Sequence, residues 1–302
     1  MISNHNVIIT GIPRSGTTLT CHLLNKLPNV VALHEPIRSP EWLPSAEQTI
    51  DGLVDDYFAM SRRSLLADKT AISKQHNGHI PDNPKSAHSL LLTTLQRLSF
   101  SRSGLEKLNL GGFGLRRSIV EHGRVTFDKP LNADFTLCIK HNGQFTGMLP
   151  SLIRRYAVCA IVRNPLAILC SWNSIDFGPR DGHMYATEKI NSELATRLAE
   201  HPDRYQRQLA LLSWFYEQYE QWLKPEQVVR YEDLIRSNGG VLSNFVTQAG
   251  SFNEVLVCNN GAYNDRTLSA MLAQRLLESN GKYWQFYTQQ SVIDLAARLD
   301  QP

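Results

Sequence analysis

The sequence is poor in cysteine and has no pair of cysteines at the CxxC spacing of metal-binding and redox motifs. It contains 5 cysteines among 302 residues, and Cys138, Cys159 and Cys170 lie within apolar runs. Such thiols are typical of reduced cysteines packed in a core. The composition therefore argues against a disulfide framework and a zinc site, and we expect no bound metal.

Long apolar runs and strong charge of one sign are also missing. No run approaches the roughly 18 residues of a membrane helix, so we expect no membrane span. The segment before the first apolar run is too short for a signal peptide, which with the reduced cysteines predicts a cytoplasmic protein. The formal net charge of +3 excludes the basic block of a nucleic-acid-binding arm. The sequence indicates nothing about the oligomeric state.

What the sequence contains is an alternation of apolar runs with helical periods. Strands are predicted at 7–10, 30–33, 135–140, 157–162 and 227–231, and helices at 17–26, 145–155, 165–173 and 203–223. This order predicts an α/β fold of the phosphate-loop (P-loop) type, in which a doubly wound, mainly parallel sheet is flanked by helices. We expect one domain over residues 1–302.

Residues 41–134 do not follow this alternation. Helices are predicted near 49–66 and 87–101, with a polar, turn-rich stretch at 73–85 between them and a glycine-rich break at 110–114. Insertions on α/β sheets often carry the substrate-binding residues. We therefore expect this helical and loop insertion to shape a substrate site.

The first predicted strand leads into the loop Gly11-Ile12-Pro13-Arg14-Ser15-Gly16-Thr17-Thr18. Its spacing matches the phosphate loop GxxxxGK[ST], except that Thr17 stands at the lysine position. The glycines let backbone amides converge on an anion, and the helix N-terminus and the threonine hydroxyls add donors. Arg14 offers a bidentate cation in place of the lysine. Because ATP and GTP hydrolases use that lysine on the β- and γ-phosphates, its absence favours a shorter, metal-free cradle.

A second motif, Arg163-Asn164-Pro165, ends another predicted strand, and Ser171 follows about two helical turns later. Together with the loop it resembles the sulfotransferase superfamily that uses 3′-phosphoadenosine 5′-phosphosulfate (PAPS). The loop is most similar to the 5′-phosphosulfate-binding loop of the protein-tyrosine and carbohydrate branches. Arg163 and Ser171 match the arginine and serine that hold the 3′-phosphate in that family. The resemblance implies that PAPS is the co-substrate, bound by Arg14 to Thr18 and by Arg163 and Ser171.

Two more segments resemble family elements. Val229-Arg230-Tyr231-Glu232-Asp233-Leu234 is similar to a strand end of the superfamily, which would place Tyr231 near the adenine. Asn280-Gly281-Lys282-Tyr283-Trp284 loosely resembles the C-terminal loop that closes over the nucleotide, where Lys282 would reach a phosphate. A solvated lysine after a glycine that ends a helix is the alternative reading of Lys282.

The same resemblance suggests a catalytic lysine. Lys140 ends the strand 135–140, at the sheet edge where ligands bind in such folds. It looks like the lysine that contacts the bridging oxygen in several branches. Lys69, in Asp68-Lys69-Thr70, weakly resembles a lysine of heparan-type enzymes, but Lys140 fits the order of elements better.

Two residues compete as the catalytic base. Glu35 follows the strand 30–33 and matches the glutamate base of the protein-tyrosine and carbohydrate branches. His141 lies near the place of the histidine of cytosolic enzymes, but shifted by one residue, and such a shift reverses the face of a strand. Glu35 is therefore preferred, and His34 is expected to point to the opposite side and pack.

These motifs predict a sulfotransferase that moves a sulfuryl group from PAPS to a hydroxyl of a carbohydrate or small-molecule acceptor, by in-line transfer with a carboxylate base. A P-loop kinase or ATPase that uses Arg14 instead of lysine is one alternative. A nucleotide-binding scaffold without catalytic activity is another.

Overall fold

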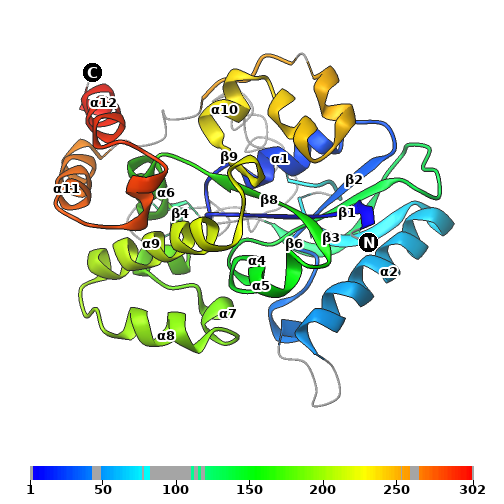
Figure 1. Ribbon diagram of the computed structural model, residues 1–302, viewed down its shortest axis with the longest axis horizontal. Coiled ribbons are helices and arrows are strands. Elements are labelled where there is room, and N and C mark those ends of the chain that lie inside the picture. The colour runs from blue at the N-terminus through cyan, green and yellow to red at the C-terminus, as the bar shows by residue number, and fades with distance from the viewer. Residues whose placement is uncertain are drawn as a thin grey trace, which may run out of the picture.

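The computed structural model describes residues 3–42, 49–76, 78–81, 110–111, 115–116, 120–252, 254–258 and 265–300. At its centre is a five-stranded sheet in the order β2-β7-β1-β8-β9, and all of its pairings are parallel. Figure 1 shows helices on both sides of this sheet. The predicted α/β class with a mainly parallel sheet flanked by helices is confirmed.

The strands of this sheet are mostly buried and rich in apolar residues, apart from the polar start of the first strand and the short last strand, in which Val229 alone is buried. They are β1 (Ser3–Gly11), β2 (Val30–His34), β7 (Thr136–Lys140), β8 (Tyr156–Val162) and β9 (Val228–Arg230). Successive side chains alternate between the faces, so Ile8 belongs to one core cluster while Val7 and Ile9 belong to the other.

The helices divide between these two clusters. The cluster of Val7 and Ile9 is completed by leucines of α1 (Thr17–Leu24) and α10 (Tyr231–Arg236). The cluster of Ile8 takes apolar side chains from α2 (Ile50–Asp68), α4 (Gly143–Gly147), α5 (Leu149–Leu152), α6 (Pro165–Asn173), α8 (Ser192–Ala199), α9 (Arg204–Trp222), α11 (Arg266–Leu277) and α12 (Gln289–Asp300). The remaining short helices are α7 (Tyr185–Glu188), η1 (Ser39–Trp42), η3 (Gly178–Asp181), η4 (Pro225–Gln227), η5 (Gly240–Asn244), η6 (Thr247–Ser251) and η7 (Lys282–Gln285).

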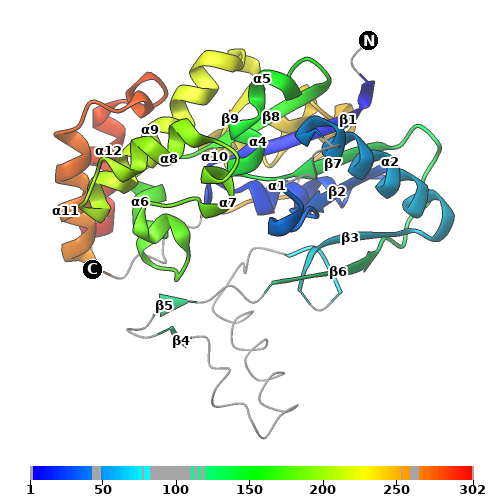
Figure 2. The same ribbon diagram turned by 90° about the horizontal axis from the view of Figure 1, so that it is seen from below.

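Two pairs of antiparallel strands lie outside the central sheet. One consists of β3 (Thr70–Gln75) and β6 (Glu121–Thr126), and the other joins β4 (Leu110–Gly111) to β5 (Leu115–Arg116). Figure 2 shows β3 and β6 apart from the central strands and near β2. The predicted turn-rich stretch is therefore wrong at its start, where Ser73 already belongs to β3.

Other boundaries of the prediction shift for local reasons. The helix predicted at 145–155 is divided into α4 and α5 at Met148, and Pro150 lies in the first turn of α5, where its missing amide is tolerated. The last strand ends at Arg230, because Tyr231 already begins α10. The break predicted at 110–114 contains β4. The helix predicted at 87–101 lies outside the described residues.

The register of the parallel strands gathers several chain segments at one edge of the sheet. His34 pairs with Lys140, and Gly11 pairs with Ile161, so β1, β2, β7 and β8 end close together. In parallel α/β sheets ligands bind outside this carboxyl edge. The loop after β1 begins at this edge, and Glu35, His141 and Arg163 each directly follow a strand that ends there.

The described part of the chain has no helix that is both long and apolar enough to cross a membrane. All five cysteine thiols are free, and Cys138, Cys159 and Cys170 are buried, as the sequence predicts.

Candidate active site

The loop between β1 and α1 is fixed by hydrogen bonds to the neighbouring elements. The Ser15 amide donates to the Ile12 carbonyl at 2.9 Å, and the Ser15 hydroxyl donates to the Ile161 carbonyl of β8 at 2.7 Å. The Trp172 indole of α6 donates to the Pro13 carbonyl at 2.9 Å. Ser15 is buried, and since both of its donors are used within the protein, it shapes the loop rather than facing a ligand.

The two glycines of the loop are required by its backbone and by its neighbours. Gly16 has a φ of 102°, and a Cβ there would lie 2.5 Å from Cδ2 of Tyr231. Gly11 has a φ of 153°, and its Cβ would lie 2.5 Å from the Ile161 carbonyl oxygen. Both contacts are too short for any other residue type, so the chain passes close to β8 and α10 only with glycine at these positions.

The first turn of α1 presents its backbone amides to the loop. Thr17 and Thr18 are the first residues of α1, and amides at this position have no carbonyl partner within the helix. Their hydroxyls are engaged within the protein: Thr17 Oγ1 donates to Asn142 Oδ1 at 3.2 Å, and Thr18 Oγ1 lies 3.1 Å from His34 Nε2. The amides and the helix dipole are therefore what this turn offers to an anion.

The structure brings the two predicted phosphate-binding motifs together. Arg14 Nε donates to Ser171 Oγ at 3.1 Å, and Arg163 Nη1 donates to the Arg14 carbonyl at 3.2 Å. Arg163 and Ser171 are buried, whereas Arg14 is exposed and has a φ of 77°. The guanidinium group of Arg163 and the hydroxyl of Ser171 thus lie beside Arg14 of the loop, an arrangement that suits phosphate oxygens.

Tyr231 packs against both the loop and Arg163. Its ring contacts Gly16, and the Arg163 guanidinium lies 4.3 Å from the ring centroid. The neighbouring Glu232 accepts hydrogen bonds from the Asn164 amide at 3.0 Å and from the Tyr287 hydroxyl at 2.7 Å. Sequence reasoning missed Glu232, although it lies inside the motif quoted for Tyr231. The predicted place of Tyr231 near the adenine stays a prediction.

Lys282 is held by α9 through its side chain and its main chain. Its Nζ lies 2.9 Å from Glu220 Oε2, and its amide donates to Ser213 Oγ at 3.0 Å; both partners belong to α9. Lys282 is thus a partly exposed lysine that pairs with α9, and its predicted contact with a phosphate of the nucleotide stays a prediction.

Glu35 and the end of β7 form the second half of the site. Lys140 Nζ lies 2.6 Å from Glu35 Oε1, and Lys74 Nζ of β3 contacts Glu35 Oε2. Burial alone would raise the pKa of the Glu35 carboxyl, but the ammonium groups of Lys140 and Lys74 hold this pKa well below its usual range. The carboxylate is therefore ionised and able to accept a proton.

The expectation that His34 packs on the opposite side is wrong. His34 Nε2 lies 3.3 Å from Lys140 Nζ and 3.1 Å from Thr18 Oγ1, so it connects the lysine to α1. The reason is that β2 ends at His34 and Glu35 has a left-handed φ of 46°, so strand alternation does not extend to this pair. Burial and, to a smaller extent, the charge of Lys140 lower the pKa of His34 to about 3, so the ring is neutral.

His141, the competing base, lies in the core instead. It is buried, its Nε2 accepts a hydrogen bond from the Ile37 amide at 3.2 Å, and its ring meets the edges of Trp42 and Phe145. Burial keeps the pKa of His141 well below its usual range. The geometry favours Glu35 over His141 as the base.

Of the two lysines considered from sequence, the structure brings Lys140 to Glu35. Lys69 follows α2, is exposed, and lies at the opposite end of β3 from Lys74. Lys74 was missed. Its signal is the strand alternation of residues 70–75, in which every second side chain is buried.

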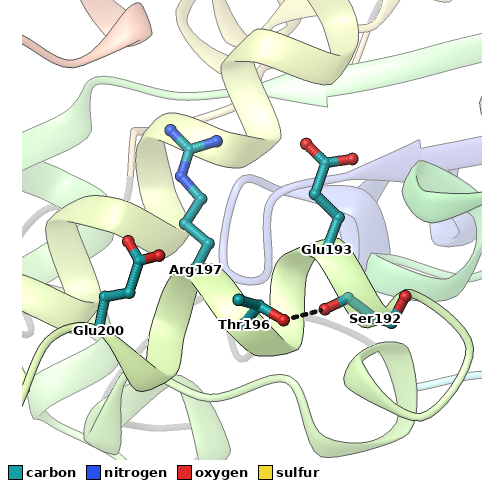
Figure 3. Close-up of a pocket in the computed structure, with 5 residues that line it drawn as sticks. All are labelled: Ser192, Glu193, Thr196, Arg197 and Glu200. Atoms are coloured by element: carbon teal, nitrogen blue, oxygen red, sulfur yellow. Dashed lines mark hydrogen bonds between the residues drawn. The ribbon is translucent and has the colours of Figure 1, made fainter.

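A surface pocket elsewhere on the molecule is lined by Ser192, Glu193, Thr196, Arg197 and Glu200 (Figure 3). The first four belong to α8 and Glu200 directly follows it, and Arg197 forms an ion pair with Glu217. The pocket is a feature of one helix surface and contains none of the candidate residues. Within the described residues, no group of three or more histidine, cysteine, aspartate or glutamate side chains is arranged to hold a metal ion.

The model of the sulfotransferase family matches residues 6–251. A sulfotransferase from Mycobacterium tuberculosis is 15% identical, with 99% of this chain and 78% of that chain covered and a TM-score of 0.33. A sulfotransferase domain from the curacin biosynthetic pathway is 14% identical, with 98% and 97% covered and a TM-score of 0.36. A sulfotransferase domain from the Synechococcus PCC 7002 olefin synthase is 15% identical, with 98% and 95% covered and a TM-score of 0.33.

No curated protein matches the chain. The family model alone spans most of the sequence, including the phosphate loop, Glu35, Lys140, Arg163 and Tyr231. The chain therefore belongs to the sulfotransferase family.

Proposed function

We propose that this sulfotransferase uses PAPS as its donor and transfers the sulfuryl group to a hydroxyl of a carbohydrate or small-molecule acceptor. The observation that carries the proposal is the meeting of Arg14, Ser171 and Arg163 beside the phosphate loop. PAPS carries a 5′-phosphosulfate and a 3′-phosphate on the same ribose, so it needs two anion-binding sites close together. The phosphate loop and the motif of Arg163 and Ser171 supply two such sites.

The residues present fit such a nucleotide. The amides of the first turn of α1 suit the 5′-phosphosulfate, and Arg163 with Ser171 suits the 3′-phosphate. The loop has Thr17 where nucleoside triphosphatases have lysine, and the Thr17 hydroxyl is bonded to Asn142. These features support a metal-free donor rather than ATP with magnesium.

The chemistry assigned to the side chains is a single displacement. The acceptor oxygen forms a bond to sulfur while the bond between sulfur and the 5′-phosphate oxygen breaks, and that oxygen keeps the electron pair. Glu35 takes the proton of the acceptor hydroxyl, and Lys140 and Arg14 stabilise the charge on the leaving phosphate. Adenosine 3′,5′-bisphosphate and the sulfated acceptor are the products.

We also propose the domain organisation, the place of the acceptor site and the cellular location. Residues 1–302 act as one domain, and the insertion 41–134 shapes the acceptor site through the described β3 and β6, which lie next to Glu35. Tyr231 lies near the adenine, and the protein works in the cytoplasm. The acceptor carries the hydroxyl that Glu35 deprotonates.

Nucleotide-induced thermal shifts test the donor. Adenosine 3′,5′-bisphosphate without magnesium is expected to raise the melting temperature, since a ligand at 100 times its Kd stabilises a protein by about 2.7 kcal/mol. ATP with magnesium and adenosine 5′-monophosphate should raise it much less. Arg163→Ala should remove most of the shift with the bisphosphate. A larger shift with ATP and magnesium would overturn the proposal.

Mass spectrometry of small molecules and glycans, after incubation of the protein with PAPS and cell extract, tests the transfer itself. A new species heavier by one SO₃ group identifies the acceptor. Glu35→Gln should reduce the rate of transfer by at least about 100-fold, because general-base catalysis contributes at least that much. Full activity of Glu35→Gln would remove Glu35 from the mechanism, and tight bisphosphate binding without any sulfated product would favour a scaffold.

A further inference from the structure

The β3–β6 pair holds the segment His34-Glu35 by both main chain and side chain. Ser73 Oγ accepts from the His34 amide at 2.9 Å and donates to the His34 carbonyl at 3.2 Å. His122 Nε2 donates to the Glu35 carbonyl at 2.8 Å, and Lys74 contacts the Glu35 carboxylate. Lys74 and His122 face each other in the strand register, so one cross-strand pair holds Glu35 at two points.

These contacts explain how Glu35 keeps its backbone conformation. A left-handed φ of 46° is unfavourable for a glutamate and persists only where the surroundings enforce it. The Glu35 amide donates to the Lys140 carbonyl at 2.8 Å, and the Glu35 carbonyl is bonded to His122. The backbone of Glu35 is thus fixed from β7 on one side and from β6 on the other.

The two lysines on Glu35 are not equivalent. Lys140 is 1% exposed, contacts Oε1, and also lies against His34, which reaches Thr18 of the phosphate loop. Lys74 is 31% exposed and contacts Oε2 from outside the central sheet. Lys140 therefore belongs to the donor side of the carboxylate, and Lys74 belongs to the side away from the phosphate loop.

We propose that Lys74 is a positioning residue that keeps Glu35 ionised and oriented while Lys140 serves the leaving phosphate of the donor. The inference rests on the proposed roles of Glu35 and Lys140. When Lys140 shares its charge with a bound phosphate, its hold on Oε1 weakens. Glu35, which is only 20% exposed, would then take up a proton at higher pH unless a second cation remained on it. Lys74 is that second cation.

Among the charged and titratable groups around Glu35, Lys74 is the second cation beside Lys140. Those that face it are Lys140 and His141 at the end of β7, His34 of β2, Lys74 of β3 and His122 of β6. His34 and His141 are held neutral by burial, and His122 bonds the main chain rather than the carboxylate. Lys74 is thus the cation that remains beside Glu35 when Lys140 interacts with the leaving phosphate of the donor.

The test measures the ionisation of Glu35 directly and needs no acceptor. Protein with ¹³C-labelled glutamate side chains is titrated in the presence of saturating adenosine 3′,5′-bisphosphate, and the Glu35 signal is assigned by its loss in Glu35→Gln. Lys74→Met should raise the pKa of Glu35 by at least about one unit, a tenfold change in its proton affinity. Lys74→Arg should restore most of the original value.

The matched control is Arg124→Met, which removes an exposed cation from β6 of the same strand pair, where it pairs with Asp68. It should leave the titration of Glu35 unchanged. A Glu35 pKa that is equal in Lys74→Met and in the unaltered protein overturns the inference, even if Lys74→Met is less stable. The donor and the base are tested separately, by the thermal shifts and by Glu35→Gln, so the failure of either is distinguishable from a failure of the role of Lys74.

Discussion

Position 16 shows how one atom limits the choice of residue in the phosphate loop. A Cβ there meets the Tyr231 ring at 2.5 Å, and the φ of 102° is itself strained for any side chain. Gly16→Ala should therefore lower the free energy of unfolding by about 1–3 kcal/mol. It should also weaken binding of adenosine 3′,5′-bisphosphate at least about tenfold, because Tyr231 must move and it packs on Arg163. Chemical denaturation and calorimetric titration measure the two effects.

Gly78→Ala separates backbone strain from the clash. Gly78 has a φ of 76°, but a Cβ there meets no atom within 4 Å. This variant should lose stability from the strained backbone alone and bind the nucleotide as before. Equal loss of nucleotide affinity in both variants would show that the contact between Gly16 and Tyr231 does not shape the site.

Left-handed backbone at residues other than glycine is found at two of the candidate functional residues, Arg14 and Glu35. Such conformations are costly, and they are kept where they direct a side chain that a relaxed backbone would misplace. In the loop the conformation lets Arg14 reach Ser171, and after β2 it lets Glu35 and His34 both reach Lys140. The left-handed conformation of Glu35 is also the reason that strand alternation misplaced His34.

At the scale of elements, the junction between α2 and β3 offers a test of the choice between lysines. Lys69 ends α2 in a left-handed conformation with φ 57° and ψ 27°, a position that glycine adopts without a Cβ penalty. Lys69→Gly should raise the free energy of unfolding by about 0.5–1 kcal/mol and leave the rate of sulfuryl transfer unchanged. Urea denaturation and the transfer assay provide the two readings.

Arg63→Gly is the matched control within the same helix. Arg63 is an exposed residue in the interior of α2, where glycine costs about 1 kcal/mol relative to good helix formers. The two glycine substitutions should thus change stability in opposite directions. A large loss of transfer activity in Lys69→Gly would instead favour Lys69 as the catalytic lysine.

The elements also show what the sequence could predict. The five central strands were predicted because strands covered on both faces are continuous apolar runs, and the loop and Arg163 were found because each directly follows such a run. The β3–β6 pair was missed because its strands mix polar with apolar residues and pair across a long stretch of chain. Lys74 and His122 were missed with it, since their approach to Glu35 depends on that pairing.

At the scale of the whole molecule, buried neutral histidines make the fold sensitive to acid. The pKa of His34 falls to about 3 and that of His141 falls well below its usual range, in each case chiefly through burial. An unfolded histidine has a pKa of about 6.5. Below that pH the unfolded chain binds two protons that the folded chain does not, so stability decreases as the pH falls.

Each histidine should remove about 1.4 kcal/mol per pH unit below 6.5, until its folded pKa is reached. Glu35 acts in the same direction at lower pH. Its folded pKa is depressed, so its contribution is present above the unfolded value of about 4.3 and is lost as the pH falls through the folded value. The protein should therefore weaken steadily from pH 6.5 and more steeply below about pH 4.3.

Urea denaturation at about pH 7.5, 6.5, 5.5, 4.5 and 3.5, a range that brackets the unfolded histidine and glutamate values of about 6.5 and 4.3, measures this dependence. His34→Gln removes one of the two protons, so its stability should fall less steeply between pH 6.5 and 4.5, by about 1.4 kcal/mol per unit, although it starts lower at pH 7.5. An unchanged slope in His34→Gln would mean that His34 is protonated in the folded protein, and Lys140 would then have to lie away from it.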